Sequence, residues 1–105
     1  MNTSEIREEA RKQAKFSFIE PSRVDALIDR VDFYRVPGTA TMICCIVLKS
    51  GFTVVDHASC KDPRNFNEEL AKSLSLSKAR DQIFALEAYA DVARPPVEAN
   101  LPNIV

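Results

Sequence analysis

The hexapeptide KDPRNF at positions 61–66 gathers side chains that suit an anionic ligand with an aromatic ring. Its lysine and arginine bring positive charge for a phosphate, its asparagine can form hydrogen bonds, and its phenylalanine can stack on a base. The Asp-Pro pair also predicts a helix start, whose free N–H groups and positive dipole end favour an anion. Phe52 offers a second ring for stacking. The predicted ligand-binding residues are therefore Lys61, Arg64, Asn65, Phe66 and Phe52.

A purely structural interpretation of the same corner stays open. Asp62 and Asn65 can cap the helix with their own side chains, Phe66 can belong to the core, and the two basic residues can be solvated. Glu68 and Glu69 follow directly, and their negative charge opposes an anion at this helix end.

His57 lies beside Asp56 and three residues before Cys60, which raises the question of a catalytic site. Catalysis needs a base, a group that orients the base, and oxyanion donors held together. Adjacent residues of a strand point to opposite faces, so Asp56 is badly placed to orient His57. We predict a surface histidine and no enzymatic activity.

The cysteines are Cys44, Cys45 and Cys60, an odd number, with two of them adjacent in an apolar run. This pattern is typical of reduced, buried thiols in a cytosolic protein. His57 and Cys60 form one H-x-x-C pair, whereas zinc sites normally show two paired ligand motifs. We predict no metal and no other cofactor.

The chain has 105 residues and a net charge of −1, with basic and acidic residues interspersed. This length predicts one domain, which we place at 1–95, followed by an extended proline-containing tail at 96–105. Without a basic patch, duplex nucleic acid is not expected as a partner. No apolar run approaches the roughly 18 residues of a membrane span, and the polar N-terminus has no signal core. We therefore expect no membrane partner and a cytoplasmic protein.

The apolar periodicity changes along the chain and predicts an α+β fold. Helical spacing in the N-terminal part gives way to β-rich segments, whose turns contain Gly38 and Gly51. A long helical segment follows. The result is a small antiparallel sheet, a three-stranded meander, covered by one long C-terminal helix and preceded by one or two short helices. The predicted helices span 4–15, 23–31 (with Ser22 as N-cap) and 62–91, and the predicted strands span 32–36, 39–48 and 52–57.

Apolar residues occupy a broad surface of the long helix. One line contains Phe66, Leu70 and Leu74, and a slightly rotated line contains Leu76, Ala79, Ile83 and Leu86, flanked by Phe84 and Tyr89. A three-stranded sheet needs less apolar surface than this. We therefore predict a homo-oligomer, a dimer or larger, with a subunit contact on this helix.

Short motifs follow one another in a specific order: Pro37-Gly38-Thr39, MICCIVL at 42–48, Gly51-Phe52, Ala58-Ser59-Cys60, Asp62-Pro63, Asn65-Phe66, Glu69-Leu70, Ala79 and Leu86-Glu87-x-Tyr89. In this order and spacing, from about residue 34 to 89, the chain resembles the "gene product forty-nine/sixty-six" family of small phage and prophage proteins. It departs from the family pattern with Phe84 in place of tryptophan and Ala88 in place of glycine, which are packing changes.

The family resemblance extends to the first family of Thoeris anti-defence proteins, which is similar in size and layout. Those phage proteins bind and sequester cyclic ADP-ribose-type signals made by host TIR-domain proteins, and do not destroy them. The resemblance implies an oligomer with ligand pockets at subunit interfaces. It does not identify individual ligand residues in this chain.

Our leading hypothesis is a phage-encoded, non-enzymatic inhibitor of host defence that sequesters a cyclic nucleotide signal. Three alternatives stay open. The chain can be an anti-CRISPR or host-takeover protein that binds a host protein, or an accessory structural oligomer. DNA binding is the least favoured because of the acidic balance.

Overall fold

The computed structural model describes residues 2–13 and 18–93. The predicted tail at 96–105 lies outside the described residues, so the proposed domain limits stay a prediction. No described helix combines enough length with enough apolar character to span a bilayer. The elements are α1 (Thr3–Gln13), α2 (Pro21–Leu27), β1 (Ile28–Arg35), β2 (Thr41–Leu48), β3 (Thr53–Ser59), a 3-10 turn η1 (Pro63–Asn65) and α3 (Glu68–Ala93).

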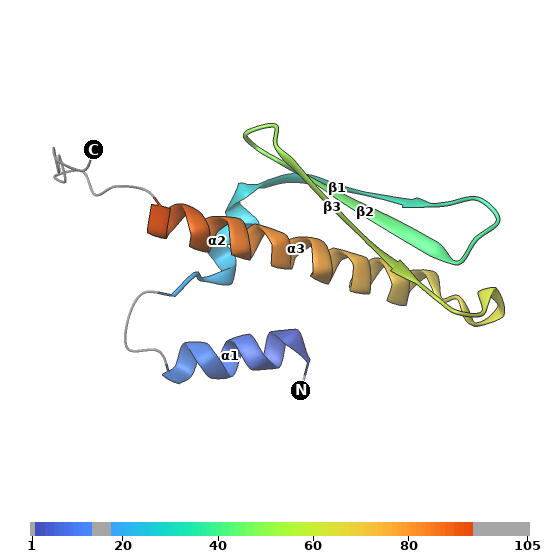
Figure 1. The fold of residues 1–105 in the computed structure, drawn as a ribbon, viewed down its shortest axis with the longest axis horizontal. Helices are drawn as coiled ribbons and strands as arrows, with labels where there is room; N and C mark the ends of the chain where they lie inside the picture. The colour runs from blue at the N-terminus through green and yellow to red at the C-terminus, as the bar shows by residue number, and fades with distance from the viewer. Residues whose placement is uncertain (1, 14–17, 94–105) are drawn as a thin grey trace, which may run out of the picture.

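The strands form one three-stranded sheet in the order β1-β2-β3, with each neighbouring pair antiparallel. Gly38 and Gly51 lie in the two connections with φ of 75° and 94°, a region that glycine enters without steric cost. Figure 1 shows the long α3 helix running along one side of this sheet. The predicted α+β meander under a long C-terminal helix is confirmed.

The predicted helix at 23–31 is wrong in its second half. α2 begins at Pro21, whose fixed φ suits the first helical position, and Glu20 rather than Ser22 is the N-cap residue. The chain turns into β1 at Ile28. Val31 and Phe33, two residues apart, both pack on the core, which is the period of a strand. Pairing with β2 thus overrides the helical spacing of the segment.

Small side chains form the contact between α3 and the sheet. The buried residues of α3 include Ala71, Ser75, Ala79 and Ile83, which recur every four residues and therefore share one helix face. The hydroxyl of Ser75 donates to the carbonyl oxygen of Lys72 at 3.2 Å, so this buried polar group is satisfied.

The predicted line of Leu76, Ala79 and Ile83, with Phe84 at its flank, packs on the core, whereas other large apolar residues of the helix lie at its margins. Leu70, Leu74 and Leu86 are 56%, 50% and 42% exposed. This difference from the predicted apolar lines supplies the exposed apolar surface discussed below.

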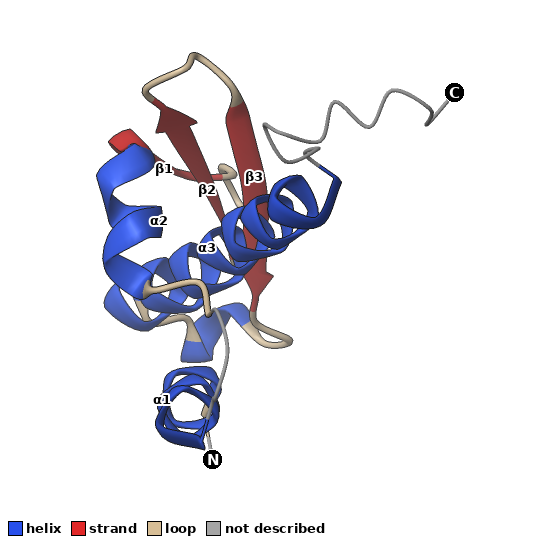
Figure 2. Ribbon diagram, turned by 90° about the vertical axis from the view of Figure 1, so that its left-hand side faces the viewer, coloured by secondary structure: helices blue, strands red, loops and turns tan. Residues whose placement is uncertain are grey.

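α1 lies on the side of α3 away from the sheet (Figure 1 and Figure 2). Asn2 caps it, because its Oδ1 accepts the N–H of Glu5 at 2.7 Å. Arg7 connects α1 to α3: its guanidinium pairs with Asp81 and stacks on Phe84, 3.8 Å from the ring centroid.

Replacing Val24 with alanine tests the docking of α2. Val24 is fully buried in the main core cluster, so Val24→Ala is expected to lower the free energy of unfolding by about 2 kcal/mol. Urea denaturation measures this loss. The matched control is Val92→Ala, because Val92 is 87% exposed on α3; it is expected to change stability by less than about 0.5 kcal/mol. Equal losses in the two variants would contradict the described packing.

Candidate functional site

The predicted ligand-binding corner links the end of β3 to the start of α3. It lies at the same end of the molecule as the β1–β2 connection (Figure 1). The predicted helix start at Asp62 is wrong, because Asp62 caps η1 and accepts the N–H of Arg64 at 2.9 Å. α3 begins at Glu68, where Asn67 Oδ1 accepts the N–H of Leu70 at 2.9 Å.

The first turn of α3 is therefore not an open anion site. The Asn67 side chain occupies one of its N–H groups, and Glu68 and Glu69 place negative charge beside the others. The predicted role for free helix amides has no support in this geometry. Any positive charge for a ligand must come from side chains.

Arg64 is ion-paired within the corner. Its Nη2 and Nε donate to the Asp62 carboxylate at 2.7 and 3.1 Å, and the guanidinium lowers the pKa of Asp62. The Arg64 side chain is 89% exposed. An exposed pair of this kind contributes little free energy, so a phosphate can compete with Asp62 for Arg64 at small cost. Lys61 and Asn65 are exposed on the same connection.

Phe66 is held between the corner and the end of β1. The Arg35 guanidinium lies over its ring, 4.0 Å from the centroid, and the side chain is half-buried. Arg35 reaches this position through the sheet register, which places it opposite Met42 and places Met42 opposite Ala58. Arg35 was not among the residues predicted from the sequence. It lies 31 positions before Phe66, and no local motif indicates that the two residues are in contact.

A pocket of about 160 Å³ opens beside Phe66, and we call it the Phe66 pocket. Its walls combine apolar side chains with a few polar groups from the corner, which is the usual character of a small-molecule site. The lining residues are Ala58, Ser59, Cys60, Asn65, Phe66, Asn67, Leu70, Ala71 and Leu74.

Phe52, the remaining predicted residue, is separated from the corner. It lies just before β3, whereas the corner follows the end of that strand. Seven strand residues span roughly 20 Å, so Phe52 does not reach the Phe66 pocket of its own chain. It lines a shallow apolar hollow with Val55 and Leu86 instead.

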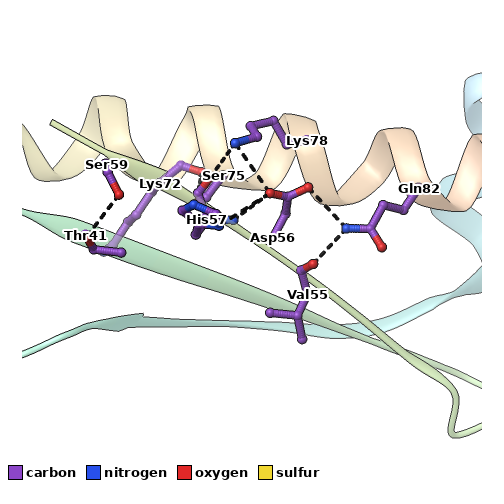
Figure 3. Close-up of polar contacts among 9 residues, drawn as sticks. All are labelled: Thr41, Val55, Asp56, His57, Ser59, Lys72, Ser75, Lys78 and Gln82. Carbon is purple, nitrogen blue, oxygen red and sulfur yellow. Dashed lines mark hydrogen bonds and ion pairs between the residues drawn. The ribbon is translucent and has the colours of Figure 1, made fainter.

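Asp56 of β3 interacts with side chains of α3 and does not orient a catalytic histidine. Figure 3 shows its carboxylate among Lys78, Gln82 and the backbone of His57. It accepts the N–H of His57 at 2.8 Å and Gln82 Nε2 at 3.1 Å, and Lys78 Nζ lies 3.4 Å away. Burial alone would raise the pKa of Asp56, but these hydrogen bonds and the lysine charge together lower it. The His57 ring is exposed, with Nδ1 3.9 Å from the carboxylate.

The three cysteines are free thiols. Cys44 is buried, and burial raises its pKa to about 11, so it is protonated at neutral pH. Cys60 Sγ donates to the carbonyl oxygen of Asp62 at 3.2 Å, which ties it to the corner. Over residues 2–13 and 18–93, no three His, Cys, Asp or Glu side chains are grouped closely enough to hold a metal ion.

A second pocket, of about 180 Å³, lies between α1 and α3. It contains two guanidinium groups, but each has a carboxylate partner: Arg7 pairs with Asp81, and Arg80 pairs with Asp25 at 2.7 Å. Both guanidinium groups are thus already engaged by carboxylates.

Asp56→Asn tests how much the contacts of the Asp56 carboxylate with α3 stabilise the fold. The folded state lowers the pKa of Asp56, so its carboxylate stabilises the fold above the unfolded pKa of about 3.9 and this contribution disappears as pH falls. The variant is expected to lose about 1 kcal/mol at pH 7. The difference from wild type should shrink below about pH 4. Denaturation across this pH range measures it, with Asp29→Asn on the exposed surface as control. A difference that is constant with pH would refute the assignment.

Comparison with protein families matches residues 19–94 to the family described as "Phage protein (N4 Gp49/phage Sf6 gene 66) family". The match covers well over half of the chain, from α2 to the end of α3. Neither the curated proteins nor the solved structures contain a match.

Proposed function

The chain belongs to the phage protein (N4 Gp49/phage Sf6 gene 66) family, and from this premise we propose that it inhibits host defence by sequestering a nucleotide. The signal would be cyclic ADP-ribose-like, and the protein would hold it without cleaving it, in the host cytoplasm. The observation that carries this proposal is the Phe66 pocket, where an aromatic ring, apolar walls and nearby basic side chains occur together.

The groups around the pocket suit the parts of a nucleotide. A base would stack on Phe66 or enter the pocket against Leu70, and Asn65 would hydrogen-bond its polar edge. Arg64 and Lys61 would approach the phosphates from the exposed side of the corner. The Arg35 guanidinium over Phe66 adds positive charge at the same place.

The size of the pocket favours a site shared between subunits. About 160 Å³ is below the roughly 300 Å³ at which small-molecule pockets usually begin. Leu70 and Leu74 at its rim are 56% and 50% exposed, so a second copy would bury apolar surface while enlarging the site. We therefore propose a homo-oligomer in which neighbouring chains complete each pocket.

Binding without turnover is the expected outcome, because the described residues at the pocket do not form a nucleophile–base pair. Cys60 donates to a backbone carbonyl, and the exposed His57 lines no part of the pocket. Two side chains in hydrogen-bond contact, with an orienting third group, are what covalent catalysis requires.

Isothermal titration calorimetry with cyclic ADP-ribose isomers and cyclic dinucleotides tests the function. We expect one of these nucleotides to bind, and we expect intact nucleotide to be recovered after the protein is denatured. A folded protein that releases no heat with any of them would remove the proposal. Recovery of a cleaved nucleotide would replace sequestration with enzymatic activity.

Substitutions in the corner locate the site once a ligand is found. Phe66→Ala is expected to weaken binding about tenfold or more, because base stacking on an aromatic ring is lost. Lys61→Ala should reduce affinity and its salt dependence, whereas Lys49→Ala, an exposed lysine in the β2–β3 turn, should not. Phe52→Ala has an informative result either way: reduced affinity would place Phe52 of another subunit at the pocket, and unchanged affinity would remove it from the predicted set.

One observation favours a second candidate function, the binding of a host protein. The C-terminal half of α3 exposes Leu86, Tyr89 and Val92, at 42%, 73% and 87%, and Leu86 shares an apolar hollow with Phe52. Exposed apolar side chains gathered in this way are typical of protein-interaction surfaces. Tyr89→Ala is expected to abolish co-purification of a host protein from lysate under this function and to leave nucleotide binding unchanged. Tight oligomers with neither partner would instead indicate an accessory structural protein.

A further inference from the structure

The two edges of the sheet differ in how their backbone groups are used. Along β3, side chains of α3 reach the outward-pointing carbonyls: Lys78 Nζ donates to His57 O and Gln82 Nε2 donates to Val55 O, both at 2.7 Å. The N–H of His57 donates to the Asp56 carboxylate at 2.8 Å. The middle of the β3 edge is therefore closed to another strand (Figure 3).

The edge of β1 has no such cover. Val36 donates its N–H to Thr41 O of β2 at 3.0 Å, and inward and outward residues alternate along an antiparallel strand. Val31 and Phe33 therefore direct their N–H and C=O groups away from the sheet. Within the described ranges, these groups have no hydrogen-bond partner.

The charges on β1 are arranged in a self-complementary way. Arg30 and Asp32 lie on the exposed face of the sheet, with side chains 63% and 58% exposed and Nε and Oδ2 3.0 Å apart. Two antiparallel copies of β1 with a two-fold axis at Val31 place Arg30 opposite Asp32 of the other copy, twice. Shifting the axis by one residue places the two Asp32 carboxylates opposite each other. Of these two neighbouring registers, the charges favour the one with the axis at Val31.

We infer that the outer edge of β1 binds a second copy of this chain, by antiparallel β1–β1 pairing about a two-fold axis at Val31. The pairing joins two sheets into one and gives each outward group of Val31 a partner in the other copy. The irregularity between Ile28 and Arg30 interrupts the ladder beyond Arg30, and the two-fold axis repeats this interruption on the other side, so the contact is short and its charges matter. This inference does not depend on the proposed nucleotide function.

Charge reversal tests whether Arg30 and Asp32 promote β1–β1 pairing. The alternative is that these charged residues prevent another strand from pairing with β1. Arg30→Asp and Asp32→Arg each create two like-charge pairs across the axis, so each single variant is expected to weaken dimerisation about tenfold or more. The double variant R30D/D32R restores both opposite-charge pairs and is expected to recover wild-type dimerisation. Sedimentation equilibrium measures the association constant of each protein.

Glu5→Arg is the control for a charge change of the same size, because Glu5 is exposed on α1, on the side of α3 away from the sheet (Figure 1), and it should leave association unchanged. Val31→Pro removes the outward N–H of Val31 without touching a bond to β2, so it should abolish pairing while urea denaturation shows a folded chain. A wild-type chain that stays monomeric up to about 1 mM would overturn the inference. So would single reversals that associate as wild type does, or a double variant that fails to recover.

Discussion

The close packing of α3 on the sheet is the interaction on which the rest of the structure depends. A three-stranded sheet is stable only when one face is covered, and α3 supplies that cover through Ala71, Ser75, Ala79 and Ile83. Small side chains bring the helix backbone near the sheet. Lys78 and Gln82 can then reach the carbonyl oxygens of β3, and Asp56 is held between helix and sheet by hydrogen bonds that lower its pKa.

The same packing decides where the unpaired surfaces lie. Leu70 and Leu74 lie beside this contact and line the rim of the Phe66 pocket, and Leu86 lines the hollow near Phe52. Exposed apolar side chains occur at both places. One helix thus supplies the core, the wall of the candidate ligand site and a surface available to another protein.

The asymmetry between the sheet edges has a similar origin. α3 runs beside β3 and its side chains satisfy that edge, whereas the described elements leave the β1 edge without hydrogen-bond partners. An edge strand with unused backbone groups is a place for association, and the alternating charges of β1 restrict which strand can pair there. The proposed association through β1 and the proposed completion of the Phe66 pocket would be separate contacts, on two distinct surfaces of the chain.

The sequence by itself determined the α+β class, the meander, the two glycine turns, the long C-terminal helix and the family, because apolar periodicity and turn chemistry are local properties. It also grouped Arg64, Asn65 and Phe66, which are adjacent in the chain. Only the tertiary structure decided that Ile28 begins a strand, that small residues face the sheet, that Asn67 caps α3, and that Arg35 covers Phe66 while Phe52 lies far away. These outcomes depend on strand register and on the distance between helix and sheet, which arise from contacts between distant parts of the chain.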